Sequence, residues 1–160
     1  MTAFRGKRIT LRHTMHIAGA PAAVFPLLCP EREKDWIDDW TYEMIYSQSG
    51  LAELDCTFKT AFPDEGEAYW VMIRHTPPSE GDYIRFVPGL MIVKLAFVLH
   101  PEGDGGCRIE VAHTFTGLSD RGNEAITEKI PAEHAQDIAR LEQLLDHYVR
   151  TGRMLKTRHS

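Results

Sequence analysis

The sequence is poor in cysteine and in long hydrophobic runs. Its three cysteines, Cys29, Cys56 and Cys107, are odd in number, widely spaced and without a C-x-x-C pair. Reduced thiols in a cytoplasmic protein are therefore the simplest interpretation. The longest apolar run, residues 90–99, contains Lys94 and has about half of the roughly 20 residues that a membrane helix needs, so no membrane span is expected.

The charged residues form no block of one sign. The chain carries 18 Lys and Arg against 23 Asp and Glu, a net charge of −5, and no run resembles the basic stripe that binds nucleic acid. No linker, internal repeat or low-complexity segment divides the chain. We expect residues 1–160 to form a single domain that binds no nucleic acid.

Motifs of common catalytic and cofactor sites are also missing. The chain has no G-x-S-x-G or H-E-x-x-H motif. The glycines of residues 103–106 lie in a predicted hairpin and do not open a helix, which makes a phosphate-binding loop improbable. We therefore expect no cofactor, and we look for function in the fold and its interior.

What the chain does contain is a clear order of secondary structure. Residues 9–17 alternate between aliphatic and polar side chains, the pattern of a half-buried strand, and His13 is the one polar residue on the apolar face. Prolines at positions 21, 26 and 30 then predict two short helices in a V, because proline opens a helix but does not continue one.

The middle of the chain is predicted to be one meandering sheet. Turn signals recur every ten to twenty residues between runs rich in Val, Ile and aromatic residues, which favours antiparallel hairpins over parallel crossover units. The predicted strands are residues 42–46, 53–62, 68–75, 83–87, 90–100 and 107–116.

A long amphipathic helix is predicted to follow the sheet. Apolar residues recur at spacings of three and four over residues 126–148, and His134 falls on the buried side of this stripe. Gly152 is placed to end the helix, and Pro131 predicts a kink or a division into two helices.

Three stretches carry a resemblance to a known superfamily: residues 20–30 (A-P-A-A-V-F-P-L-L-C-P), 33–37 (E-K-D-W-I) and 115–119 (F-T-G-L-S). With the element order, they resemble the helix-grip fold of the START-like (SRPBCC) superfamily, which includes polyketide cyclases, lipid-transfer domains and the major pollen allergen family. Within it the chain is similar to a little-characterised bacterial branch. The resemblance covers nearly the whole chain.

The resemblance implies an α+β fold. A seven-stranded antiparallel sheet would curl around a long C-terminal helix, with two short helices after the first strand. It also implies a cavity between the sheet and the helix that holds a hydrophobic or aromatic small molecule. It implies no fixed set of catalytic residues, so function has to be argued from the site.

Alternation predicts which polar residues face such a cavity. His13 on the first strand and His113 on the last strand share the inward faces, toward the helix that carries His134 and Asp137. These four are our candidate catalytic residues for general acid–base chemistry. The favoured alternative is structural, with separate core histidines that never meet; a polar ligand-contact cluster and a metal site are the others.

Aromatic side chains are concentrated where the cavity is expected, and aromatic walls with a few polar groups suit a small-molecule site. Arg74 shares the predicted face of Trp70 and Met72, so it either escapes to solvent, the safer interpretation, or fixes an anionic or carbonyl group. We expect Met44, Phe58, Met72, Phe97 and Phe115 to be buried. The predicted ligand-binding residues are Trp36, Trp40, Tyr42, Met44, Tyr46, Phe58, Trp70, Met72, Arg74, Phe115, Ile138 and Leu141.

Two predicted strands, residues 69–73 and 90–99, are apolar on both faces. A sheet with one buried face should alternate, so a covering second subunit, and hence a homodimer, is a hypothesis.

Three functions stay open at this point. The first is the binding of a hydrophobic or aromatic small molecule in an internal cavity. The second is an enzyme of the cyclase, dehydratase or hydrolase kind that uses inward His or Asp side chains as general acid or base. The third is an interaction or scaffold domain with a vestigial cavity.

Overall fold

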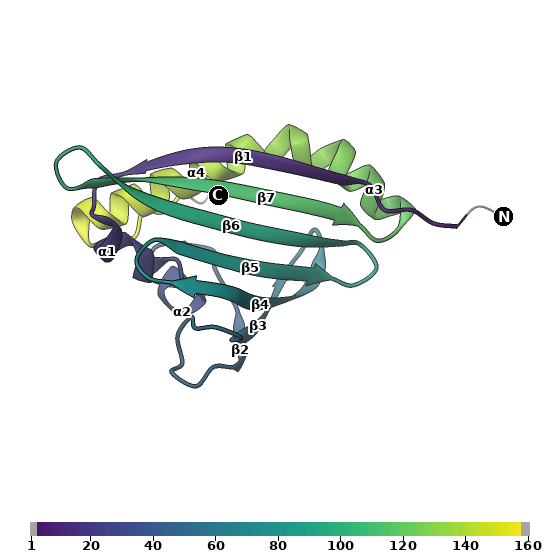
Figure 1. The fold of residues 1–160 in the computed structure, drawn as a ribbon, viewed down its shortest axis with the longest axis horizontal. Coiled ribbons are helices and arrows are strands. Elements are labelled where there is room, and N and C mark those ends of the chain that lie inside the picture. Colours follow the sequence, from purple (N-terminus) through teal and green to yellow (C-terminus); the bar gives the residue numbers. More distant parts are fainter. Residues whose placement is uncertain (1–2, 158–160) are drawn as a thin grey trace.

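The computed structural model of the chain describes residues 3–157 and shows one antiparallel sheet with a long helix across it (Figure 1). The order of the strands is β1-β7-β6-β5-β4-β3-β2, and every neighbouring pair is antiparallel. This confirms the predicted fold class. The strands are β1 (Arg8–Ile17), β2 (Glu43–Tyr46), β3 (Thr57–Phe62), β4 (Gly66–Thr76), β5 (Glu80–Val87), β6 (Met91–Glu102) and β7 (Gly106–Gly117).

The first and last strands lie side by side in the sheet. Their register runs from Arg8 opposite Thr116 to Ile17 opposite Cys107, so the pairing joins residues that are about a hundred positions apart. This pairing places the inward faces of β1 and β7 together under the long helix, as the alternation of residues 9–17 predicts.

Three short helical turns follow β1, as the prolines predict: α1 (Pro21–Val24), η1 (Phe25–Leu27) and α2 (Pro30–Glu33). Pro21 and Pro30 each open a helix, where the missing N–H is not needed. Glu31 and Glu33 lie in the first turn of α2. These turns lie at one end of the sheet, beside α4 (Figure 1).

The C-terminal helical segment is divided into α3 (Asp120–Thr127) and α4 (Lys129–Thr151). The break falls at Glu128, so Pro131 lies in the first turn of α4, where its missing N–H costs no hydrogen bond. The hydroxyl of Ser119 accepts a hydrogen bond from the Gly122 amide and caps α3. Gly152, in the left-handed conformation with a φ of 71°, ends α4.

The core lies between the inner face of the sheet and the helices. Four of the five residues predicted to be buried are so: Phe58, Met72, Phe97 and Phe115. The prediction for Met44 is wrong, because β2 is the edge strand of the sheet and Met44 is only half-buried there.

Two β-bulges turn predicted inward residues toward solvent. The register shifts between Met44 and Tyr46, so that Tyr46 opposes Thr57 and is 67% exposed. It shifts again between Met72 and Arg74, so that Arg74 opposes the outward Asp82. One extra residue inverts the alternation, which is why Tyr46 and Arg74 do not share the predicted face.

The outer face of the sheet is largely open to solvent. Tyr69, Ile73, Phe86 and Ile92 are large hydrophobic residues exposed on this face. The predicted homodimer would cover them; it stays a prediction, and a monomer in light scattering at micromolar concentration would contradict it.

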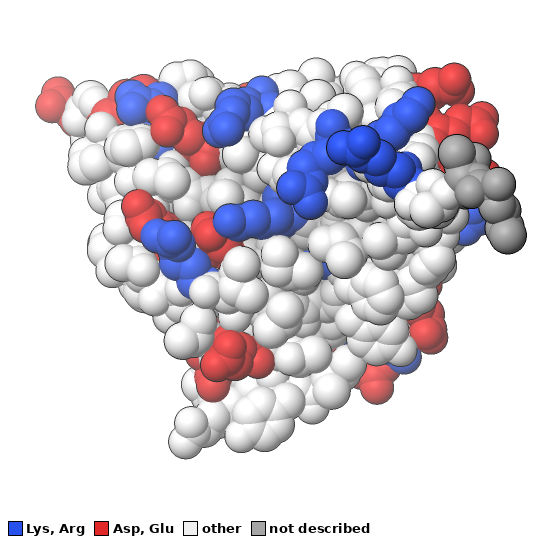
Figure 2. All heavy atoms as spheres, turned by 45° about the vertical axis from the view of Figure 1, so that its right-hand side comes forward, with Lys and Arg blue, Asp and Glu red and all other residues white. Residues whose placement is uncertain are grey.

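Surface charge is organised by the fold more than by the sequence. On the side shown in Figure 2, Lys and Arg side chains form a band flanked by acidic side chains and broad uncharged areas. The sequence has no run of like charge, so this band arises where separate strands and loops meet. Within residues 3–157, no helix is long and apolar enough to cross a membrane.

Candidate functional site

A cavity of about 540 Å³ lies between the inner face of the sheet, α2 and α4. Its wall is mostly aromatic and aliphatic, and it is open at one side, between the first half of α4 and the β3–β4 turn. Seven of the predicted ligand-binding residues line it: Trp36, Trp40, Phe58, Trp70, Phe115, Ile138 and Leu141.

The other predicted ligand-binding residues lie outside the cavity. Tyr42 and Met44 pack against the core without lining it, and Met72 is buried in the core. Tyr46 is exposed, and the Arg74 guanidinium binds Glu80 at 3.0 Å on the outer face. The safer interpretation of Arg74, escape to solvent, is thereby confirmed.

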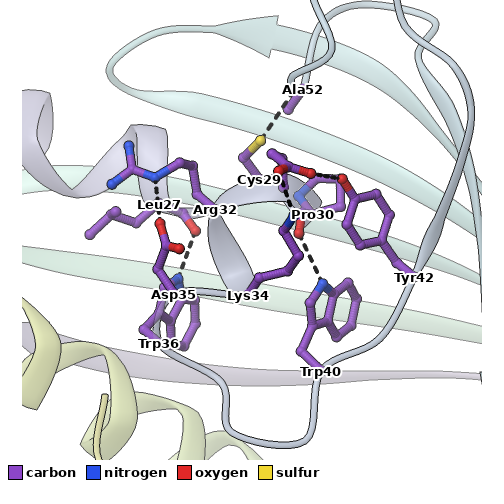
Figure 3. Close-up of polar contacts among 11 residues, drawn as sticks. Leu27, Cys29, Pro30, Arg32, Lys34, Asp35, Trp36, Trp40, Tyr42 and Ala52 are labelled. Carbon is purple, nitrogen blue, oxygen red and sulfur yellow. Dashed lines mark hydrogen bonds and ion pairs between the residues drawn. The ribbon is translucent and has the colours of Figure 1, made fainter. Parts of the chain in front are cut away.

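The α2 side of the cavity is held rigidly by hydrogen bonds (Figure 3). The Trp36 indole donates from Nε1 to the Leu27 carbonyl at 2.9 Å, and the Trp40 indole donates to the Pro30 carbonyl at 2.9 Å. The Tyr42 hydroxyl donates to Glu31. These bonds fix the planes of two indole rings that form part of the cavity wall.

Trp70 is the centre of the sheet side. Its ring stacks on Phe58, with ring centroids 5.3 Å apart and planes at 13°, and its Nε1 donates to the Thr60 hydroxyl at 2.9 Å. The Arg85 guanidinium lies over the same ring at 5.5 Å and pairs with Glu65. This geometry offers a flat, rigid surface to a ligand.

Three of the four candidate catalytic residues come together. His134 Nε2 and His113 Nδ1 are 3.0 Å apart, and the His13 ring centroid lies 4.9 Å from that of His134. The histidines therefore meet, and the alternative of separate core histidines is wrong. His13 faces α4 from β1, and unlike His113 and His134 it does not line the main cavity.

Burial keeps the histidine pair uncharged. It lowers the pKa of His113 to about 3, helped by the nearby charges of His134, Arg85 and His13. It also lowers the pKa of His134 to about 4, helped by His13. Both imidazoles are therefore neutral at neutral pH and act as hydrogen-bonding groups.

The direction of the hydrogen bond follows from an unpartnered atom. His134 Nδ1 is buried and has no partner among the described residues. A buried N–H without an acceptor is rarer than an acceptor without a donor, so the proton of His134 belongs on Nε2, which donates to His113 Nδ1. His113 then carries its proton on Nε2, where it can donate to a ligand.

Asp137, the fourth candidate, lies apart from the histidines. It lines the open side of the cavity on α4 and is exposed. Partial burial raises its pKa, and the charge of Glu133 adds to this effect. No hydrogen bond or ion pair joins it to the imidazoles within residues 3–157.

Glu33 is a cavity residue that the sequence analysis missed. It lines the cavity beside Tyr83, and burial raises its pKa to about 8. Its carboxyl group forms no hydrogen bond or ion pair with the described residues. Helical spacing could have found it, because Glu33 precedes the buried Trp36 and Ile37 by three and four positions.

Charged side chains surround the open side of the cavity. Lys129 at the start of α4 lies 3.9 Å from Asp64 in the β3–β4 turn. Arg140 binds Asp38 at 2.8 Å and Asp39 at 3.1 Å. These pairs tie α4 to the two loops on the other side of the opening.

Metal binding has no geometric support. Within residues 3–157, no group of three or more His, Cys, Asp or Glu side chains is arranged to hold a metal ion. The three histidines contact one another without forming such a group.

No family model and no curated protein matches the sequence. Solved structures are similar. One is an uncharacterised protein from Rhizobium leguminosarum, with 16% identity over 91% of this chain and 99% of that chain, and a TM-score of 0.65. Norcoclaurine synthase from Thalictrum flavum shows 13% identity over 92% and 89%, with a TM-score of 0.67. Ara h 8.0201 shows 17% identity over 91% and 99%, with a TM-score of 0.64. At these identities the similarity establishes the fold alone.

Proposed function

We propose that this chain, which has the helix-grip fold of the START-like superfamily, binds a small hydrophobic or aromatic molecule in the cavity between its sheet and α4. The observation that carries the proposal is an aromatic-walled cavity of about 540 Å³ that contains polar groups without protein partners. Ligand pockets have volumes of roughly 300–1,000 Å³ and few, well-placed polar groups.

The wall determines the shape of the ligand. Phe58 and Trp70 are stacked and immobilised by the Thr60 hydroxyl, and Trp36 is fixed from the other side. Rigid, parallel rings favour a flat body that can stack on them. His113 offers one hydrogen-bonding nitrogen and Glu33 offers a carboxyl group, so the ligand should carry one or two polar atoms.

A thermal-shift screen tests this proposal. The compounds are aromatic ketones, phenolics, fatty acids and sterols, tested against wild type, Trp70→Ala and Tyr69→Ala. A ligand that binds only the folded state stabilises it by about 2.7 kcal/mol at a hundredfold excess over Kd. Trp70→Ala should lose the hits, whereas Tyr69→Ala, which removes an exposed ring from the outer face of the same strand, should keep them.

The scaffold alternative predicts the opposite result. No hit in the screen, together with an experimental structure whose interior is filled, would leave an interaction domain with a vestigial cavity.

Acid–base catalysis is a second candidate, and Glu33 favours it. A general acid works best when its pKa lies near the working pH, and burial raises the pKa of Glu33 to about 8. The neutral histidine pair is a poor acid at this pH but can orient a substrate. Mass spectrometry of each screening hit after incubation tests this candidate; turnover by wild type and not by Glu33→Gln supports it, and unchanged hits contradict it.

A further inference from the structure

Glu33 is surrounded by cations that are already paired. On α2 and just after it, Lys34 binds Glu31 at 2.6 Å and Arg32 binds Asp35 at 3.0 Å. Inside the cavity Arg85 pairs with Glu65. No described cation is left for Glu33, and an unpartnered carboxyl group in an apolar cavity is costly.

The whole lining carries a surplus of acid. Six carboxyl side chains line the cavity, and three Lys and Arg side chains do. Each of the three cations is paired with one of these acids: Arg85 with Glu65, Lys129 with Asp64 and Arg140 with Asp39. Glu33 inside and two acids at the opening, Glu133 and Asp137, remain without a cation. Such a lining attracts positive ligands and repels carboxylates.

Aromatic rings accompany the unpartnered acid. Glu33 lies close enough to Tyr83 for its charge to raise the pKa of that hydroxyl, after the larger effect of burial. The Tyr83 ring meets Phe58 and Trp70 edge to face, with ring centroids 5.9 and 6.1 Å apart. Ring faces attract cations, so a carboxyl group among such rings matches an ammonium group.

From these contacts we propose that the cavity selects a protonated amine on an aromatic body, and that Glu33 binds the ammonium group. This inference rests on the proposed function and names the class of its ligand. The aromatic body lies against Trp70 and Phe58, and the ammonium group supplies the cation that Glu33 lacks. The acids at the opening favour the entry of the same charge.

Matched ligands separate charge from shape. We choose three bodies (phenyl, indole and naphthalene), each carrying an ethylamine, an ethanol or an acetate side chain. Isothermal titration calorimetry at pH 8 is expected to rank the amine of a body at least about tenfold above its alcohol, with the acetate weakest. An acetate that binds as tightly as the amine overturns the proposal.

Glu33→Gln is the decisive variant, because it keeps the shape and removes the charge. The variant should lose at least about tenfold in amine affinity and change alcohol affinity less than about threefold. Asp104→Asn removes an exposed acid from the β6–β7 turn and is the control for net charge; it should leave both affinities unchanged. Equal amine affinity in wild type and Glu33→Gln overturns the proposal.

Proton release gives an independent readout. With a pKa of about 8, Glu33 is mostly protonated at pH 7 and must ionise to bind an ammonium group. Amine binding should therefore release up to one proton, and amine affinity should rise by up to about tenfold between pH 7 and pH 8. Calorimetry in two buffers of different ionisation enthalpy measures the proton.

The other groups that face the cavity do not titrate in this range. From β7 and α4, His113 and His134 have lowered pKa values of about 3 and 4. From β5, burial raises the pKa of Tyr83 well above 10, and Arg85 is paired with Glu65. At the opening, Asp137 has a raised pKa; Asp137→Asn tests its share and should keep the proton release. Loss of the release in Asp137→Asn, with Glu33→Gln keeping it, contradicts the role of Glu33.

Failure of this inference is distinguishable from failure of the proposed function. Alcohols that bind as tightly as amines, in wild type and in Glu33→Gln alike, overturn the amine proposal and leave the ligand-binding function standing. The absence of binding by all three amines also overturns it, whereas hits among neutral compounds in the wider screen would still support the function.

Discussion

The two sides of the cavity keep buried polar groups neutral in different ways. On the β1, β7 and α4 side, His113 and His134 hydrogen-bond to each other, and burial lowers their pKa values. On the α2 side, Glu33 has no protein partner, and burial raises its pKa to about 8. The comparison separates a pair that the protein satisfies by itself from a group that is left for a ligand.

Acid should expose the histidine side first and with the largest effect. Because both pKa values are lowered in the folded state from 6.5, to about 3 and about 4, the unfolded chain binds more protons as pH falls below 6.5. The free energy of unfolding should fall by up to about 1.4 kcal/mol per pH unit for each histidine between pH 6.5 and 4. Urea denaturation at pH 7, 6 and 5 measures this.

The variant His113→Asn should remove about half of that acid dependence. His16→Asn changes an exposed histidine on the outer face of β1 and serves as the control. If wild type and His113→Asn show the same dependence on pH, the histidine pair is not the cause.

Base should act on the α2 side, with a smaller effect because one group titrates. The pKa of Glu33 is raised from 4.5 to about 8, so its contribution to stability is complete below pH 4.5 and is lost as pH rises through 8. The free energy of unfolding of wild type should fall by up to about 1.4 kcal/mol per pH unit in this range. Glu33→Gln should lack this fall and be more stable than wild type at pH 8, as chemical denaturation at pH 5 and pH 8 will show.

The fixed polar groups beside Glu33 should give a smaller effect still. Trp36→Phe removes the donor to the buried Leu27 carbonyl and should lower the free energy of unfolding by about 1–2 kcal/mol. Trp40→Phe removes the corresponding donor to Pro30 at a less buried position and should cost less. Thermal denaturation of both variants compares them, and an equal cost would show that burial does not set the energy.

The smallest effect is expected at Arg74, which lies on neither side of the cavity. Its guanidinium is 54% exposed and pairs with Glu80 on the outer face. Arg74→Ala should change stability by less than about 0.5 kcal/mol and leave ligand affinity unchanged. A loss of affinity in calorimetry would place Arg74 in the site after all.

The fold was predictable because period and turn chemistry agree along most of the chain. Alternation over residues 9–17 and the recurring turns specify antiparallel strands, and the prolines specify short helices. The differences are local. The strand predicted at 53–62 begins at Thr57, because Asp55 adopts a φ of 68° and the Cys56 amide turns back to the Glu53 carbonyl. The helix divides at Glu128, and Pro131 fits into the next first turn.

The site was less predictable because its parts depend on packing. Alternation places Trp70 and Phe58 on the inner face, but a single bulge residue moves Tyr46 and Arg74 out of it. Glu33 looked like an acid in a first helical turn, placed to complement the helix dipole. Its position in the cavity follows from how α2 packs on the sheet, which no local pattern specifies.

The pairing of β1 with β7 also has a consequence for folding kinetics. Strand neighbours about a hundred residues apart must find each other before the inner face closes, and the loop entropy of such contacts is lost before they stabilise anything. Proteins dominated by long-range pairing fold in milliseconds to seconds. The cavity therefore forms last, and the apolar inner faces of the central hairpins stay wet until the two ends of the sheet meet and α4 docks.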